Sequence, residues 1–492
     1  MTNMKGNPQA VNKIAELLLV VPLIFFIISL SGCTTVKTPS LPGEVWAPPK
    51  WDRSQKEADL AWKALKSREL PQNGEKITLT DVVIISLKNN PTAMEAIEKT
   101  KAAKAKLKQA ESSWFPQVSI GAKGEIDKQH TNRKSDDIDH MAAGPSAKIE
   151  MLLLDFGGRA SRAKEALYGL FSSSYQYNQT IQDLILNAEL SYFNYFAAEA
   201  TRDAREDDLN NAKTTWVSAD SKMKAGLGTL VDVLQAKSTY DNALYTLEDS
   251  REKVKIAWAD LATVMGVPAD SRFSPEYPST ISPPDIPQEE ISVLIDQALG
   301  ERPDISALRA SVKSKKASLD AANSDLLPTL NMGYSAEGNQ YAYYGAEKNN
   351  PLNDKRADAQ TGYISVNWDI FDGFNNYARK KEAEALYAAE MYDLSRAELK
   401  ASADVWNKYY GYKTSLSKLT AARSYFESAK GSYELATESY SAGLKTILDV
   451  LQAQKQLADA RSTLIAARFS VFTSLAKLAH ATGRIGVPQG DQ

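Results

Sequence analysis

Two stretches of the chain are almost the same: AGLGTLVDVLQA at residues 225–236 and AGLKTILDVLQA at residues 442–453, with nine of twelve positions identical. Each follows a long segment without proline that is rich in alanine, serine and leucine, residues 158–224 in the first case and 373–440 in the second. Such segments predict helices, and at the usual rise per residue each would be about 100 Å long. Helices of this length indicate coiled-coil packing.

The repeated stretch carries the signals that end one helix and begin the next. A glycine in the left-handed conformation commonly ends a helix, and a threonine followed three residues later by an acidic residue has the spacing of a capping box. The residues in these positions are Gly226, Thr229 and Asp232 in the first stretch, and Gly443, Thr446 and Asp449 in the second. Each stretch therefore predicts the tip of a helical hairpin, where the chain turns back on itself.

The similarity extends through most of the chain, as in proteins built from internal repeats. The other matching pairs are SLKNNP (86–91) with ALGERP (298–303), WFPQVSIG (114–121) with LLPTLNMG (326–333), and LLDFGG (153–158) with IFDGFN (370–375). We therefore expect two halves with one order of elements: helix, strand, loop, strand, long helix, tight turn, helix. The expected boundaries are 76–265 for the first half, 266–287 for a proline-rich linker, 288–486 for the second half and 487–492 for a C-terminal tail.

Shorter helices are expected on either side of the linker. They cover residues 229–265 and 291–326, and their combined length nearly matches that of one long helix. We therefore expect two shorter helices to lie end to end beside each long one.

Four segments alternate between apolar and polar residues, which predicts strands whose two faces differ. They are residues 117–126 and 146–156 in the first half, and 330–336 and 364–370 in the second. Strands between lipid and water show this alternation, as do half-buried strands of soluble sheets, so the pattern alone leaves both open. The polar stretches 127–143 and 338–360 predict long hydrophilic loops. His130 and His140 fall in the first of them and are expected to be solvated.

The N-terminal region has the features of an export signal. Residues 17–30 form an apolar run behind two lysines, which is too short for a spanning helix and typical of a signal peptide over residues 1–32. The run ends in LSGC, which resembles a bacterial lipobox and predicts a lipid on Cys33, the single cysteine of the chain. An unlipidated signal peptide is the alternative. The proline-rich residues 33–75 predict an extended, lipid-anchored arm.

The composition argues against several other functions. A net charge of −3 gives no excess of basic residues, so we expect no nucleic acid partner. Three histidines and one cysteine leave little for a metal site or a Cys/His catalytic pair. DFG at 155–157 and GLG at 226–228 lack the accompanying motifs of a kinase or a dinucleotide-binding fold. We therefore expect neither an enzyme nor a cofactor other than the lipid.

The strands constrain the number of chains in the assembly. No apolar run after the signal peptide approaches the length of a transmembrane helix, so a membrane would have to be crossed by strands. One chain offers too few strands, because a closed barrel needs about eight or more and open sheet edges do not occur in lipid. We therefore expect two, three or four copies to share one barrel. The expected fold class is mainly α, with a long coiled-coil α-barrel tunnel and a β-barrel membrane part.

Taken together, these motifs resemble the TolC family of outer-membrane efflux and secretion channels. The resemblance covers residues 76–486 and rests on the duplication, the helix starts NNP and ERP, the strand entries FP and LP, the corners LDFGGR and FDGF, and the two hairpin tips. It implies a homotrimer that forms one twelve-stranded barrel in the outer-membrane lipid, above a helical tunnel through the periplasm. It also implies that the tips close the tunnel, and that a periplasmic adaptor protein and an inner-membrane transporter open it to export small molecules or proteins.

The resemblance assigns roles to residues of both tips. A tyrosine, a basic residue and two acidic residues would close the tunnel and attract cations, and the matching positions are Tyr440, Lys445, Asp449 and Gln452. Gln452 departs from the pattern, because an amide stands where an acid is expected, which implies one ring of carboxylates in place of two. Asp232 of the first tip belongs to the same expected gate. The residues expected to contact the adaptor are Gly226, Leu227, Thr229, Gly443, Leu444 and Thr446.

The alternative function is a periplasmic coiled-coil scaffold or adaptor protein that is anchored by its lipid alone. Adaptors also contain helical hairpins, but they lack a full internal duplication and paired alternating strands. Cleavage of residues 127–143 by a protease added to intact cells would separate the two functions, because only a channel displays this loop outside.

Overall fold

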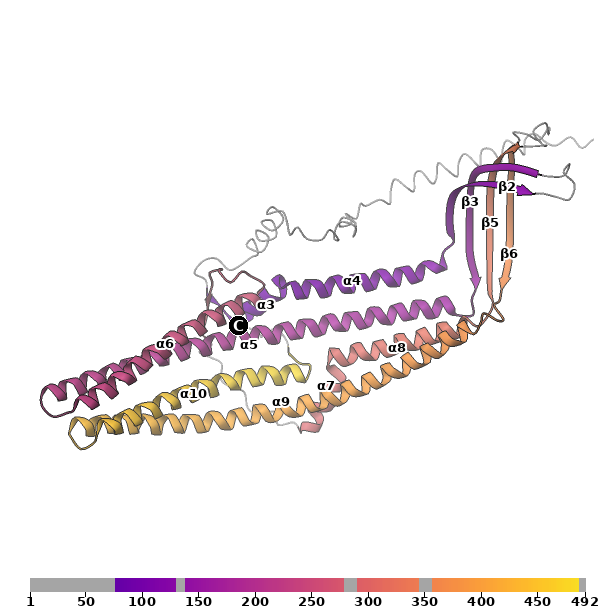
Figure 1. The fold of residues 1–492 in the computed structure, drawn as a ribbon. Helices are drawn as coiled ribbons and strands as arrows, with labels where there is room; N and C mark the ends of the chain where they lie inside the picture. The colour runs from indigo at the N-terminus through magenta and orange to yellow at the C-terminus, as the bar shows by residue number, and fades with distance from the viewer. Residues whose placement is uncertain (1–75, 130–137, 278–289, 345–355, 486–492) are drawn as a thin grey trace, which may run out of the picture. The chain divides into compact units, whose positions relative to one another are not determined.

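The structure, a computed structural model, describes residues 76–129, 138–277, 290–344 and 356–485 (Figure 1). The predicted signal peptide, Cys33, the extended arm, His130 and the C-terminal tail lie outside the described residues. Within these ranges, no helix combines the length and the apolar character that crossing a bilayer requires.

The two halves of the chain contain the same α-helices and long strands in the same order, which confirms the duplication. The first half contains α3 (Leu79–Asn89), α4 (Pro91–Glu111), the short η2 (Ser112–Trp114), β2 (Gln117–Gln129), β3 (Ile138–Leu154), α5 (Gly158–Lys224) and α6 (Leu230–Val264). The second contains α7 (Ile291–Glu301), α8 (Pro303–Ser324), β5 (Thr329–Tyr344), β6 (Arg356–Asn367), α9 (Asn375–Ser441) and α10 (Ile447–Ala481). Two short strands, β1 (Lys76–Ile77) at the start of the first half and β4 (Ser274–Pro275) in the expected linker, pair in parallel.

The long helices α5 and α9 have 67 residues each and organise the shorter ones. The helices α4 and α6 lie along α5, while α8 and α10 lie along α9 and also contact α5 (Figure 1). This confirms that two shorter helices accompany each long one. The expected single helix over 291–326 was wrong, because the chain breaks between α7 and α8 at Arg302. Arg302 is extended, as a residue before a proline usually is, and Pro303 starts the new helix.

The four long strands form one antiparallel sheet in the order β2-β3-β5-β6. Residues directly opposite each other in the register lie on the same face, so the pairs Val118 with Ile149 and Ile149 with Tyr334 place apolar side chains on one face. Glu150 and Gly333 are opposite each other on the other face, which carries the polar side chains. The register therefore confirms the alternation expected from the sequence.

The strands are longer on one side than expected, and the loops are correspondingly shorter. Strand β3 already begins at Ile138, β5 continues to Tyr344 and β6 begins at Arg356, so most of the predicted loop residues belong to strands. At the other end β6 stops at Asn367, three residues before the expected strand end. The expectation was wrong because strand pairing uses backbone groups, and a polar run can remain paired when neither face requires apolar residues.

Each strand-to-helix corner is held by an aspartate. The Asp155 carboxylate accepts a hydrogen bond from the backbone amide of Arg159 (2.5 Å), and the Asp372 carboxylate accepts one from the amide of Asn376 (2.8 Å). At the first corner Phe156 and Gly157 adopt positive φ angles of 49° and 96°. The DFG tripeptide is therefore a corner that starts α5, with its carboxylate on the helix N-terminus.

The main apolar core lies where α3, α5, α6 and the end of α10 meet. It contains a group of aromatic residues, of which Phe193 on α5 stacks on Phe472 on α10 with ring centroids 5.1 Å apart. The hydroxyl of Tyr192 donates a hydrogen bond to the carbonyl oxygen of Glu276, next to β4. The described part of the expected linker is thus hydrogen-bonded to the core. The sequence did not predict β1 and β4, because a two-residue strand is too short to show an alternating pattern.

The same joint occurs once in each half, where a returning helix meets the start of a helix that leads to the strands. In the first half Asn90, the N-cap of α4, donates its amide to the carbonyl oxygen of Val264 (2.9 Å). In the second half Arg302 occupies the equivalent position and donates to the carbonyl oxygen of Ala481 (3.1 Å). The last carbonyl groups of the returning helix therefore accept a hydrogen bond from a neutral amide in the first half and from a guanidinium in the second.

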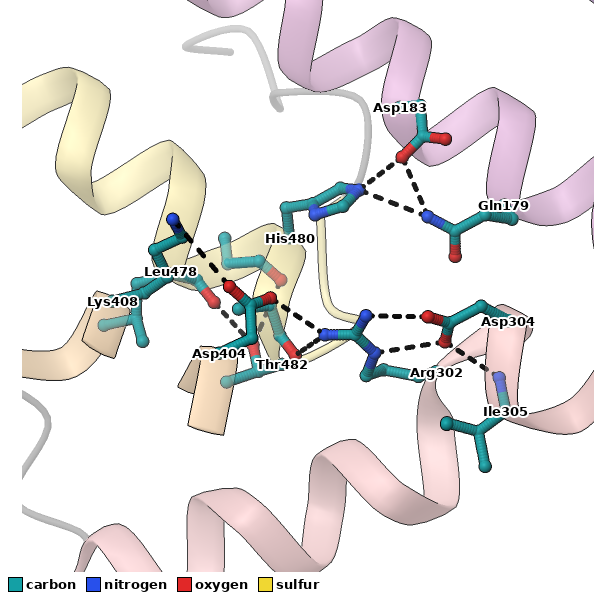
Figure 2. Close-up of polar contacts among 12 residues, drawn as sticks. Gln179, Asp183, Arg302, Asp304, Ile305, Asp404, Lys408, Leu478, His480 and Thr482 are labelled. Atoms are coloured by element: carbon teal, nitrogen blue, oxygen red, sulfur yellow. Dashed lines mark hydrogen bonds and ion pairs between the residues drawn. The ribbon is translucent and has the colours of Figure 1, made fainter. Parts of the chain in front are cut away.

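Two aspartates lie around the guanidinium of Arg302 at the second joint (Figure 2). Its guanidinium lies 2.7 Å from Asp304 and 3.1 Å from Asp404 on α9, and its side chain is only 12% exposed. Burial alone would disfavour the charged Asp304, but the hydrogen bonds and charge of Arg302 outweigh it and lower the pKa of this carboxyl. Beside this group, Nε2 of His480 lies 2.7 Å from Asp183 on α5 (Figure 2).

The charged joint predicts a large effect of removing its cation. Arg302→Met should lower the free energy of unfolding by about 3 kcal/mol, because it removes the counter-charge of Asp304 and leaves Asp404 with only the more distant Lys408 (3.8 Å). Thermal or denaturant unfolding of the solubilised protein measures this. Arg309→Met is the matched control: Arg309 makes an exposed pair with Glu398 (3.0 Å), so its loss should cost less than about 1 kcal/mol. Equal effects of the two variants would contradict the role of the joint.

Candidate functional site

The two hairpin tips form the candidate functional site, and both end their long helix in the same way. At the first tip the amides of Gly226 and Leu227 donate to the carbonyl oxygens of Met223 (2.9 Å) and Lys222 (2.8 Å). Gly226 has a φ of +76°. This pair of hydrogen bonds is a Schellman motif, which needs a left-handed residue and therefore favours glycine.

The second tip repeats this geometry. The amides of Gly443 and Leu444 donate to the carbonyl oxygens of Tyr440 (3.1 Å) and Ser439 (2.8 Å), and Gly443 has a φ of +75°. The turn expected from the repeated stretch is therefore confirmed in both halves.

A capping box starts the second helix of each hairpin, as the sequence predicts. At the first tip the amide of Thr229 donates to the Asp232 carboxylate (2.9 Å), and the amide of Asp232 donates to Oγ1 of Thr229 (3.2 Å). At the second tip the matching distances between Thr446 and Asp449 are 2.9 Å and 3.4 Å. Both aspartates, which were expected to act in a gate, therefore also hold the start of their own helix.

Of the residues expected to close the gate, Lys445 and Asp449 contact each other on the second hairpin rather than a residue of the first. Nζ of Lys445 lies 3.7 Å from Oδ1 of Asp449, one turn along on the same hairpin. Hydrogen bonds from Thr446, with a smaller contribution from Lys445, lower the pKa of the Asp449 carboxyl, so it is ionised at neutral pH. Gln452 is exposed. The hydrogen bonds that Asp449 accepts come from Thr446 in its own capping box, rather than from the other hairpin.

Apolar side chains project from the ends of both tips. Leu227 and Leu444, which follow the two glycines, are 79% and 81% exposed. The other exposed apolar residues of the tips are Leu230, Val231, Leu234 and Leu448. The residues expected to contact an adaptor therefore lie on a surface where apolar groups are open to a partner.

The two hairpins meet through a small apolar cluster and polar contacts. The buried members of the cluster are Ala219, Val233, Ala236 and Ile447, with Trp216, Met223, Tyr440 and Leu451 packed around them. Tyr440 is half-buried there, and burial together with the charge of Asp232 raises the pKa of its phenol. Farther from the tips, Oγ1 of Thr215 on α5 donates to the side chain of Gln454 on α10 (3.3 Å).

Lys222 makes a contact between the tips that the sequence did not indicate. Its Nζ donates to the backbone carbonyl oxygen of Tyr440 and lies 3.8 Å from the centroid of the Tyr440 ring. A lysine in the last turn of a helix is ordinary, because it faces the negative end of that helix. Only the folded structure shows that Lys222 instead contacts the C-terminal end of α9, in the other hairpin.

A buried ion pair fastens α5 to α10 farther from the tips. Asp208 on α5 is 8% exposed, and its carboxylate accepts a hydrogen bond from Arg461 on α10 (2.8 Å). Arg205 also donates to it (3.2 Å) and reaches Ser462 (3.0 Å). Burial raises the pKa of the Asp208 carboxyl, and the two arginines oppose this shift. Sequence reasoning missed this pair, since each residue alone is an ordinary charge on a helix.

Comparison with known proteins gives the same fold and a family. A family model described as outer membrane efflux protein matches residues 84–267 and 294–484. The outer membrane protein TolC of Escherichia coli strain K12 is 25% identical over 408 residues, which cover 81% of this chain and 80% of that protein. The outer-membrane channel OprN superimposes with a TM-score of 0.71 at 20% identity, over 86% of this chain and 96% of that one. The CmeC outer membrane channel of Campylobacter jejuni gives 0.72 at 18% identity, over 85% and 91%.

The capping boxes predict a measurable local effect. Thr446→Ala should destabilise the start of α10 by about 1 kcal/mol, because Thr446 is its N-cap. Amide hydrogen exchange should then become about fivefold faster in the first turn of α10, and remain unchanged at the first tip. Thr420→Ala, at an exposed position inside α9, is the control and should not weaken protection. Unchanged exchange in Thr446→Ala would show that the box does not stabilise the tip.

Proposed function

Because this chain belongs to the outer membrane efflux protein family, we propose that three copies form an outer-membrane channel with a periplasmic helical tunnel. The tunnel is opened by an adaptor protein and an inner-membrane transporter. The cargo is a small molecule or a protein that leaves the cell through the shared interior.

The two faces of the sheet are the observation that carries the proposal. Apolar residues on one face are exposed, for example Ile120 at 78% and Ile364 at 72%, with no described element covering them. On the other face Lys148 pairs with Glu150 (2.7 Å), and the hydroxyl of Tyr363 donates to Glu150 (2.5 Å). A sheet with one apolar and one polar face fits a wall between lipid and water.

The edges of the sheet support an oligomer. The outer strands β2 and β6 each have one hydrogen-bonded neighbour among the described residues, so each leaves one row of backbone groups for another chain. In lipid such rows must be paired, and three four-stranded sheets joined edge to edge close one barrel. We therefore propose a homotrimer.

The tips support the proposed entrance to the channel. They lie at the end of α5 and α9 opposite the strands, and a 67-residue helix separates the two ends by about 100 Å. Lys445, Asp449, Tyr440 and Asp232 would close this entrance, and the exposed leucines would contact the adaptor. With Gln452 in place of an acid, Asp449 supplies one ring of carboxylates for cations. A lipid on Cys33 would add a second attachment to the outer membrane.

A crosslinked pull-down from cells that express the intact chain tests the proposal. Recovery of an adaptor with a proton-driven exporter would identify a small-molecule duct, whereas an ATP-driven transporter would identify a secretion duct. The double variant Leu227→Asn, Leu444→Asn is the matched control, which should keep the oligomer but lose the adaptor. A chain that recovers no adaptor and is inaccessible to protease on intact cells would favour the lipid-anchored scaffold.

The proposed gate predicts an increased ion leak when its charges are removed. Lys445→Met and Asp449→Asn should each raise the conductance of the purified channel in a planar bilayer by about twofold, since a half-exposed ion pair contributes about 0.5 kcal/mol. Lys455→Met, an exposed lysine farther along α10, is the control for the loss of one positive charge. Unchanged conductance in both gate variants would remove Lys445 and Asp449 from the gate.

A further inference from the structure

The ends of α5 and α9 differ in the charges that face them. The last turn of α5 contains Lys222 and Lys224, whereas the last turn of α9 contains no basic residue. In the duplication, Lys222 corresponds to Ser439. The C-terminal carbonyl groups of a helix carry partial negative charge and are stabilised by a nearby cation. The last turn of α9 therefore supplies no cation of its own to these carbonyl groups.

Lys222 supplies this cation from the neighbouring hairpin. Its ammonium group donates to the carbonyl oxygen of Tyr440, the same oxygen that accepts the Gly443 amide in the second turn (3.1 Å). The backbone carbonyl oxygen of Lys222 accepts the Leu227 amide in the first turn (2.8 Å). One residue thus takes part in the first turn through its backbone and in the second turn through its side chain.

The other lysines of the two tips are engaged within their own hairpins. Nζ of Lys224 lies 2.6 Å from Asp220 on α5, and Nζ of Lys445 lies 3.7 Å from Asp449 on α10. Among the tip lysines that the structure describes, only Lys222 contacts the other hairpin. Its ammonium also lies over the Tyr440 ring at 3.8 Å, a cation–π distance.

We propose that Lys222 is a gate residue of this channel: its ammonium group holds the second hairpin tip against the first through the carbonyl oxygen and ring of Tyr440. We name this contact the Lys222 latch. It rests on the proposed function, and it adds a residue that lies outside the set implied by the family resemblance. Opening of the α9–α10 hairpin would have to break the latch.

The latch uses the ring and the backbone of Tyr440, and not its hydroxyl. No hydrogen bond from this hydroxyl to any described residue is found. Tyr440→Phe should therefore leave the channel as closed as the wild type, while Tyr440→Ala, which removes the ring, should leak. A gate that relied on the hydroxyl would give the opposite result for Tyr440→Phe.

Conductance of the purified channel in a planar bilayer tests the latch directly. Lys222→Met keeps most of the apolar stem but removes the charge, and should raise the closed-state conductance by about tenfold. Lys222→Arg should restore closure, because a guanidinium can donate to the same carbonyl and lie over the same ring. Lys224→Met removes a lysine two residues away that faces Asp220, and should match the wild type. Circular dichroism and the oligomeric state confirm that each variant is folded.

The outcomes separate the latch from the function on which it rests. Wild-type conductance in a folded Lys222→Met variant would overturn the latch while leaving the channel intact. Equal leaks in Lys222→Met and Lys222→Arg would also overturn it, because they would point to packing rather than to charge. A wild-type protein that forms no pore in the bilayer would instead contradict the proposed function. A leak in Lys222→Met that Lys222→Arg reverses supports the latch.

Discussion

The peptide groups at helix ends need partners, and in this chain both α5 and α9 begin at a corner with a strand and end at a hairpin tip. The corners beside the sheet use the carboxylates of Asp155 and Asp372 on the next helix. The tips use glycine turns and capping boxes, and the joints use the side chains of Asn90 and Arg302. Because the corners and the tips set where α5 and α9 begin and end, they determine how far the sheet lies from the tips.

The two halves bind their equivalent helix ends with different side chains. A neutral amide closes the first joint, whereas a guanidinium with two carboxylates closes the second. The second hairpin is also joined to α5 by two cations: Arg461 pairs with Asp208, and Lys222 contacts the carbonyl oxygen and ring of Tyr440. The largest apolar core, in contrast, lies away from the tips. The tips are thus joined by polar contacts and a smaller apolar cluster than the core, which fits the opening that we propose for them.

The sequence predicted the parts of the candidate site that depend on neighbours along the chain. Gly226 and Gly443 end helices, and Thr229 and Thr446 start them, because hydrogen bonds three to five residues apart follow from residue type and spacing. The contacts between hairpins were not predictable in this way. Lys222 and Tyr440 are 218 residues apart, and the pair Asp208 and Arg461 is 253 residues apart. Nothing in the spacing marks these charges among the many on the surfaces of long helices.

By itself, the sequence determined the duplication, the order of elements, the two faces of the sheet and the hairpin tips, since these follow from periodicity and local hydrogen bonding. It did not determine where polar strands end, because backbone pairing extended β3, β5 and β6 into residues that read as loops. The tertiary structure alone decided which cation meets which helix end. A charge has no preferred partner until the fold brings one within a few ångströms, and the packing of α5 against α10 makes that choice.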